Sequence, residues 1–193
     1  MNTQTIILSL LAVVILIVAG LAVWLAFSKM RSNKLRKKFG PEYEYTIEKT
    51  GDRRTAEALL TEREKRVSEL NIRALSPDEL ERYQAEWLHI QADFLDVPAE
   101  SVNNADSLIK EVMLARGFPV VDFEHRLEDI SVLYPNVVSN YRSAHDIALK
   151  NQDENASTEE LRQAMIYYRS LYQELLGAQN SIQEAQTKEA MSV

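Results

Sequence analysis

The chain has 193 residues, no cysteine and a formal net charge of −7. The lack of cysteine excludes disulfides, thiolate metal sites, iron–sulfur clusters and cysteine nucleophiles. Residues 42–193 carry all 29 acidic residues but only 16 of the 22 basic ones, which gives this part a net charge of −13. Nucleic acid is therefore not an expected partner, because phosphate binding needs a basic face.

An apolar stretch follows a five-residue leader, residues 1–5. Residues 6–27 form a run of 22 residues without a charge. As a helix, this run is about 33 Å long, enough to cross the hydrocarbon core of a bilayer. A signal peptide has a shorter apolar region and a small-residue cleavage site, and a core helix is interrupted by polar residues at helical spacing. We therefore predict a single transmembrane helix over residues 6–27, with the lipid bilayer as its partner.

A basic juxtamembrane segment, residues 28–41, comes next and contains no acidic residue. Positive charge beside a span stays on the cytoplasmic side. The expected location is the inner (plasma) membrane in a single pass, with the N-terminus outside and the soluble domain in the cytoplasm; the alternative places the soluble domain in the periplasm. Six cations are expected to contact anionic lipid at the membrane surface: Lys29, Arg31, Lys34, Arg36, Lys37 and Lys38.

The transmembrane run also contains small residues that bear on self-association. Ala22 and Ala26 lie four residues apart, on one face of a helix. Small residues at this spacing let two transmembrane helices approach closely. A weak homodimer through this helix is therefore a further expectation.

The soluble domain is predicted over residues 42–177, after Gly40 and Pro41 end the membrane helix. Apolar residues recur at helical spacing, and no segment alternates convincingly as a strand. A first helix covers about 56–70. The second has the clearest start in the chain, an N-cap serine followed by proline and glutamate, Ser76-Pro77-Asp78-Glu79. Its apolar stripe is expected at the centre of the core: Leu80, Tyr83, Trp87, Ile90 and Phe94.

Further helices are predicted from local start and stop signals. Gly117 closes the third, because glycine readily adopts the left-handed conformation that ends helices. The tail, residues 178–193, is rich in Gln and Ala and is expected to be frayed or exposed. Short connections between the helices predict an all-α fold, a soluble antiparallel bundle of about five or six helices behind the single transmembrane helix. The remaining helix starts are predicted at Asp96 with Pro98, at Asp122, at Pro135, and at Ser157 with Glu160.

No motif in the chain points to catalysis. Glu86 and His89 have the Glu-x-x-His spacing of helical di-iron proteins, but a second such motif is absent and a surface pair is the favoured interpretation. There is no Gly-x-Ser-x-Gly turn and no phosphate-binding glycine loop. We therefore expect no enzyme activity, no cofactor and no metal. The predicted function is a membrane-anchored acidic module for protein–protein interaction or scaffolding with an unknown protein partner; the alternative is a small-molecule or metal-binding helical sensor.

Two short segments combine aromatic and guanidinium groups. Arg116 and Phe118 lie in one, and Tyr141 and Arg142 in the other. Such groups are suited to a groove that binds a partner. The favoured alternative is that the aromatic side chains complete the core while the arginines pair with local acids.

Several short segments between about residues 35 and 176 form a recognisable set. They are Phe39–Tyr43, Thr50–Arg54, Ile72–Ser76, Arg82–Trp87, Gln91–Phe94, Glu111–Met113, Arg116–Pro119, Asn140–His145 and Thr158–Met165. Over this range the chain resembles a family of uncharacterised bacterial membrane-anchored helical proteins. The resemblance implies an N-terminal span, a helical domain and a bacterial origin; no activity is assigned to the family, and no catalytic residue is carried over.

Overall fold

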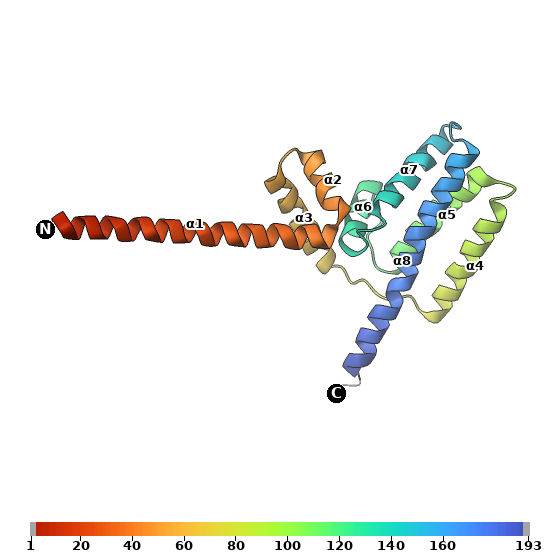
Figure 1. Cartoon of the computed structure of the whole chain (residues 1–193). Helices are drawn as coiled ribbons and strands as arrows, with labels where there is room; N and C mark the ends of the chain where they lie inside the picture. The colour runs from red at the N-terminus through yellow and green to blue at the C-terminus, as the bar shows by residue number, and fades with distance from the viewer. Residues whose placement is uncertain (1–2, 191–193) are drawn as a thin grey trace. The chain divides into compact units, whose positions relative to one another are not determined.

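The computed structural model describes the backbone of residues 3–190 and the side chains of residues 11, 15–23 and 25–177. Over these residues the chain forms eight helices and no strand (Figure 1), which confirms the predicted all-α fold. The first two residues of the predicted leader and the last three of the predicted tail lie outside the described residues. The chain divides into two compact units, Met1–Leu60 and Thr61–Val193, whereas the sequence predicts one soluble domain over 42–177.

The first unit contains the long helix α1 (Thr3–Phe39), the short helix α2 (Pro41–Thr50) and the beginning of α3 (Arg53–Ser68). As predicted, α1 ends at Phe39: Gly40 follows with a φ of 51°, and Pro41 opens α2. The helix is continuous from the apolar run through the whole basic cluster. The apolar run and the basic cluster are therefore parts of one helix.

One stretch of α1 is long and apolar enough to cross a membrane, judged by length and composition. It covers Ile15–Phe39, and the described residues contain no other such stretch. The predicted span, residues 6–27, begins nearer the N-terminus, where residues 3–10 and 12–14 are described by their backbone alone. Large apolar side chains of α1 are more than half exposed: Leu11, Ile15, Leu16, Ile17, Val18, Leu21, Val23, Leu25 and Phe27.

The sequence did not identify α2 as a separate helix, and the reason lies in its composition. The residues that α2 buries are Glu42, Tyr43 and Thr46, two of which are polar. A search for apolar residues at helical spacing cannot detect a helix with such a face. Gly51 ends α2 in the left-handed conformation, with a φ of 70°.

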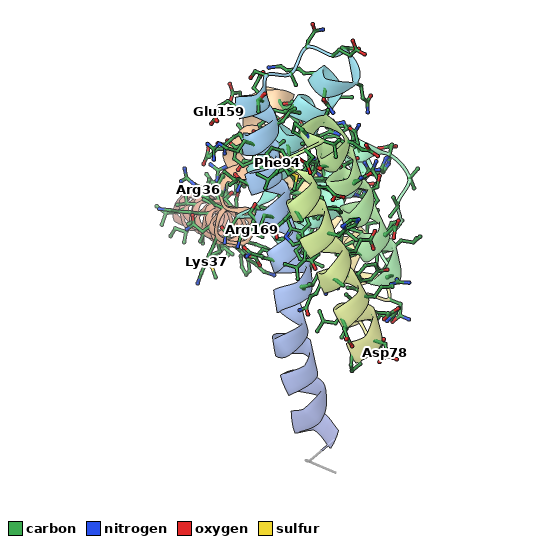
Figure 2. All side chains as sticks on the ribbon, turned by 90° about the vertical axis from the view of Figure 1, so that its right-hand side faces the viewer. Arg36, Lys37, Asp78, Phe94, Glu159 and Arg169 are labelled. Atoms are coloured by element: carbon green, nitrogen blue, oxygen red, sulfur yellow. The ribbon has the colours of Figure 1, made fainter. Side chains whose placement is uncertain are left out.

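The second unit holds five complete helices; with α2 and α3, seven helices follow α1 in the described residues, against the five or six predicted for the soluble domain. The five complete helices are α4 (Pro77–Asp93), α5 (Pro98–Ala115), α6 (Phe123–Leu133), α7 (Val138–Gln152) and α8 (Thr158–Ala190). The helix α8 packs against both α5 and α7, while α4 packs on α5 and α6 on α7. Figure 2 shows that α4, from Asp78 to Phe94, runs opposite in direction to α8, from Glu159 to Arg169.

Both predicted capping boxes are confirmed. The backbone N–H of Glu79 donates to Ser76 Oγ at 3.2 Å, and the Ser76 N–H donates to Glu79 Oε2 at 2.8 Å. The same reciprocal bonds join Ser157 and Glu160: the Glu160 N–H donates to Ser157 Oγ at 3.3 Å, and the Ser157 N–H donates to Glu160 Oε2 at 2.9 Å. Each pair satisfies N–H groups that have no partner within the helix.

Two other predicted helix starts are wrong in detail. The residue that precedes α5 is Val97, with no side-chain cap, so Asp96 does not perform this role. Pro135 lies in a turn, and α7 begins three residues later, at Val138. At the other end of the unit, α8 passes Gly177 without a break and continues to Ala190, so the tail begins as a continuation of this helix.

The core of the second unit includes the apolar stripe predicted on α4. Tyr83, Trp87 and Ile90 are buried, while Leu80 and Phe94 at the two ends are half-buried. Trp87 stacks on the ring of Tyr172 from α8, with 4.6 Å between the ring centres. The most deeply buried apolar residues of α5 complete this core: Val102, Ala105, Leu108, Ile109, Val112 and Met113.

Candidate functional site

The polar site of the first unit depends on the path of α2. Figure 1 shows α2 folding back over the end of α1. Arg36 on α1 forms an ion pair of 2.5 Å with Glu44 on α2, and a small pocket of about 190 Å³ between these helices is lined by Ser32, Asn33 and Ile47 among others. Residues earlier in α1 thus lie beside residues later in α2, so the two helices are antiparallel. The ten residues of α2 return the chain by about 15 Å along α1.

Glu57, in the first part of α3, joins the three helices of this unit. Its Oε1 accepts hydrogen bonds from the Ser32 hydroxyl of α1 at 2.5 Å and from the Tyr43 hydroxyl of α2 at 2.7 Å. It also accepts one from Arg53 Nε at 2.9 Å, within α3. One carboxylate therefore connects elements that lie 25 and 14 residues away in the sequence.

The charges in this cluster follow from these contacts. Burial would raise the pKa of Glu57, but the hydrogen bonds from Ser32, Tyr43 and Arg53 outweigh it and hold the pKa below its ordinary value of 4.5. Burial, and then the hydrogen bond to Glu57, raises the pKa of the Tyr43 hydroxyl. At neutral pH the cluster therefore contains an ionised Glu57, a protonated Tyr43 and a charged Arg53.

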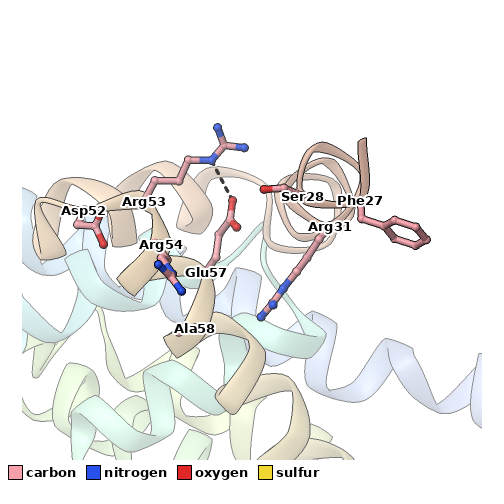
Figure 3. Close-up of a pocket in the computed structure, with 8 residues that line it drawn as sticks. All are labelled: Phe27, Ser28, Arg31, Asp52, Arg53, Arg54, Glu57 and Ala58. Carbon is pink, nitrogen blue, oxygen red and sulfur yellow. Dashed lines mark hydrogen bonds and ion pairs between the residues drawn. The ribbon is translucent and has the colours of Figure 1, made fainter. Parts of the chain in front are cut away.

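Beside this cluster lies a pocket of about 690 Å³, drawn in Figure 3. One wall comes from α1 and the other from the first turns of α3 and the residue before it. We call this the arginine pocket, and it is lined by Phe27, Ser28, Arg31, Asp52, Arg53, Arg54, Glu57 and Ala58. Three guanidinium groups against two carboxylates leave its lining with one net positive charge.

Neutralising Glu57 is expected to loosen α2. Because the pKa of Glu57 is lowered in the folded state, its stabilising effect is present above pH 4.5 and is lost as the pH falls through the lowered pKa. We expect Glu57→Gln to reduce the hydrogen-exchange protection of α2 amides about tenfold at pH 6, in line with the loss of a charge-assisted hydrogen bond.

In the wild-type protein, the hydrogen-exchange protection of α2 amides, corrected for intrinsic exchange rates, should fall only under acid conditions. Glu62→Gln is the matched control, since Glu62 is an exposed glutamate five residues further along α3. Equal protection of α2 in the wild-type protein and Glu57→Gln at pH 6 would show that the carboxylate does not hold the three helices together.

The six predicted membrane-surface cations all lie on α1. Five are exposed and Lys38 is half-buried. Arg31 lines the arginine pocket and Arg36 pairs with Glu44. Arg53, Arg54 and Glu57 are site residues that the sequence did not predict. The available signal was local: Gly51 stops one helix, and Asp52 caps the next by accepting from the Thr55 N–H at 2.8 Å.

The predicted partner groove does not exist as such, because Arg116, Phe118 and Tyr141 are at most 1% exposed. Only Arg142 reaches the surface, and it is half-buried. The two aromatic residues belong to the core, as the favoured alternative expects. Both expectations for Arg116, a groove residue or a partner of a local acid, are wrong. The guanidinium group donates to Tyr134 Oη at 2.6 Å, to the Leu175 carbonyl at 2.7 Å and to the Arg73 carbonyl at 3.3 Å.

The Glu-x-x-His segment of α4 is at the surface. His89 is exposed and its Nε2 lies 3.4 Å from Asp93 Oδ2, one turn further along the same helix. Among the residues whose side chains are described, no group of three or more His, Cys, Asp or Glu side chains is placed to hold a metal ion.

Comparisons of the chain with protein-family models, with curated proteins and with solved structures find no match.

Proposed function

We propose that the chain is a single-pass protein of a bacterial inner membrane that holds an acidic helical domain at the cytoplasmic face as a protein-interaction module. The observation that carries this proposal is the exposure of α1. Its described large apolar side chains from Ile15 to Phe27 are more than half exposed, so the described residues leave this surface uncovered. Contiguous apolar surface of this kind is costly in water, and the hydrocarbon core of a bilayer covers it.

The direction of insertion is argued from charge. Six cations and no acidic residue follow the apolar run, and such a cluster is retained on the cytoplasmic side. With the N-terminus outside, α1 delivers the rest of the chain to the cytoplasm. The alternative is a periplasmic soluble domain, and labelling of single cysteines distinguishes the two placements.

An interaction role is supported by the character of the second unit. Its buried aromatic and apolar residues form one core, and Arg116, which the sequence offered for a groove, hydrogen-bonds within that core. The acidic excess of residues 42–193 favours a partner with a basic surface, because complementary charge speeds association and selects partners.

Cysteine labelling tests the topology directly, because the chain contains no cysteine of its own. Two single variants are needed: Asn2→Cys in the leader and Leu88→Cys on α4, where the side chain is 66% exposed. In spheroplasts, a membrane-impermeant maleimide is expected to label Asn2→Cys at once and Leu88→Cys only after lysis. The reverse pattern would place the soluble domain outside the cytoplasm, and labelling of both in intact spheroplasts would refute membrane insertion.

The same Leu88→Cys variant tests the interaction module. The variant is labelled with a photoreactive maleimide in opened membranes. It is expected to crosslink to a specific protein, and an excess of the unlabelled wild-type chain should compete for that protein and reduce the crosslink. Ile90→Cys, buried two residues further along α4, is the control and should give no adduct. Crosslinks that do not compete would count against a specific partner.

The alternative function, a small-molecule sensor, is favoured by one observation, the arginine pocket. Its volume of about 690 Å³ lies within the usual range of ligand sites. The chemistry of its lining decides what class of ligand it fits.

A further inference from the structure

We propose that the arginine pocket binds the phosphate group of an anionic phospholipid. The inference rests on the proposed membrane insertion of α1. It goes beyond a general attraction between the basic segment and the membrane, because it places a defined site between α1 and α3 and includes Arg53 and Arg54, which lie outside that segment.

The carboxylates of the pocket are occupied by contacts within the protein. Glu57 accepts from Ser32, Tyr43 and Arg53 through one oxygen. Asp52 Oδ2 accepts from the Thr55 N–H at 2.8 Å and from the Thr55 hydroxyl at 2.7 Å, as the cap of α3. Both carboxylates therefore make contacts within the fold, and three guanidinium groups lie in the same lining.

The guanidinium groups come from both walls. Figure 3 shows Arg31 extending from α1 and Arg54 from α3, with Arg53 directed to Glu57. Arg31 and Arg54 are exposed. A guanidinium group binds phosphate oxygens with two parallel N–H donors, and such bonds are stronger than those between neutral groups. Two arginines from different helices therefore form a clamp suited to a phosphate.

The depth of the pocket favours a lipid as the source of this phosphate. Arg31 lies four residues beyond Phe27, the last residue of the apolar run, which is about 6 Å along the helix axis. The polar layer on each side of a bilayer is roughly 5–8 Å thick. Because α2 returns the chain along α1, the start of α3 lies at the level of this turn, and Arg54 reaches the same layer.

The remaining lining fits an amphiphilic ligand. Phe27, the last residue of the apolar run, lines the pocket together with the charged Arg31 and Arg54. A phospholipid likewise combines a charged phosphate with apolar acyl chains. Free phosphate has no group to place against Phe27.

The test uses the full chain in nanodiscs of phosphatidylcholine with increasing phosphatidylglycerol, and counts retained anionic lipid by native mass spectrometry. The double variant R31Q/R54Q is compared with K34Q/K37Q, which removes the same charge from exposed positions of α1 that do not line the pocket. We expect R31Q/R54Q to weaken retention about tenfold, as for the loss of one strong charge-assisted contact. K34Q/K37Q should change it less than about twofold.

Equal losses in the two double variants would overturn the inference, because they would show a diffuse charge effect. Circular dichroism and hydrogen exchange of α2 establish that R31Q/R54Q is folded, and Arg54→Lys, which keeps the charge, should restore part of the retention. Resistance of both variants to carbonate extraction tests membrane insertion separately, so a failed lipid site is distinguishable from a failed anchor.

A second arm separates the two sources of phosphate. Glycerol 3-phosphate is titrated into the wild-type chain in discs of phosphatidylcholine alone. Absence of binding at millimolar concentration is the expected result. Tight binding that is lost in R31Q/R54Q would overturn the lipid assignment in favour of a soluble phosphate ester.

Discussion

Replacing Gly117 with alanine is expected to destabilise the second unit by about 2–4 kcal/mol, an effect large for a single methyl group. Gly117 ends α5 with a φ of 94°, a conformation that L side chains rarely adopt. A Cβ at this position would lie 2.5 Å from the carbonyl oxygen of Asn71, so the backbone of one segment would have to move. The backbone strain at this φ and the overlap of the added Cβ with the Asn71 carbonyl oxygen both destabilise the folded state.

Thermal unfolding of the full chain in detergent, followed by far-ultraviolet circular dichroism, measures this effect. A loss of 2–4 kcal/mol corresponds to a fall in Tm of roughly 10 °C for a unit of this size. Gly177→Ala is the matched control: Gly177 is helical, nothing lies within 4 Å of its added Cβ, and alanine favours helices, so stability should stay equal or rise by up to about 1 kcal/mol. Similar behaviour of the two variants would contradict the steric argument.

Trp87→Ala should cost about 3–5 kcal/mol, as expected for truncation of a buried tryptophan. The Trp87 side chain is 5% exposed and stacks on Tyr172 with an angle of 14° between the rings. Truncation removes this contact between α4 and α8 and leaves a cavity that the surrounding helices can fill only in part.

The neighbouring residue provides a control for the helix itself. Leu88→Ala changes an apolar side chain that is 66% exposed, and is expected to alter the free energy of unfolding by no more than about 0.5 kcal/mol. Trp87→Phe keeps an aromatic ring against Tyr172 and should fall between the two. Denaturant unfolding in detergent measures all three, and a loss in Leu88→Ala equal to that in Trp87→Ala would show that the stripe on α4 is assigned to the wrong face.

The features that could be predicted from the sequence are those with short-range causes. The reciprocal bonds of Ser76 and Glu79 join residues three apart, and the left-handed Gly117 ends a helix within one turn. The apolar stripe of α4 is periodic, so its buried face follows from spacing alone. These signals were sufficient for the fold class and for most helix boundaries.

The features that escaped prediction depend on contacts between distant segments. Glu57 lies in a helix rich in charged residues, and nothing local distinguishes it from the other glutamates there; its partners Ser32 and Tyr43 become neighbours only after α2 folds back. Arg116 was predicted either to line a groove or to pair with a local acid, and neither prediction places its guanidinium group in the core. Its burial is made tolerable by two backbone carbonyls and a phenol from three other segments, none of which a local pattern reveals.

The return path of α2 also has a mechanical consequence. A pull between α1 and the far end of α3 is resisted by the bonds of Glu57 to Ser32 and Tyr43 together with the buried apolar side chains of the first unit. While these contacts hold, the residues between Ser32 and Glu57, which are 25 positions apart in the sequence, contribute almost no length to the tether. Once these contacts break, the same residues span at most about 80–90 Å when extended. The first unit thus contains a folded reserve of length, and the Glu57 carboxylate is one of the contacts that keep it folded.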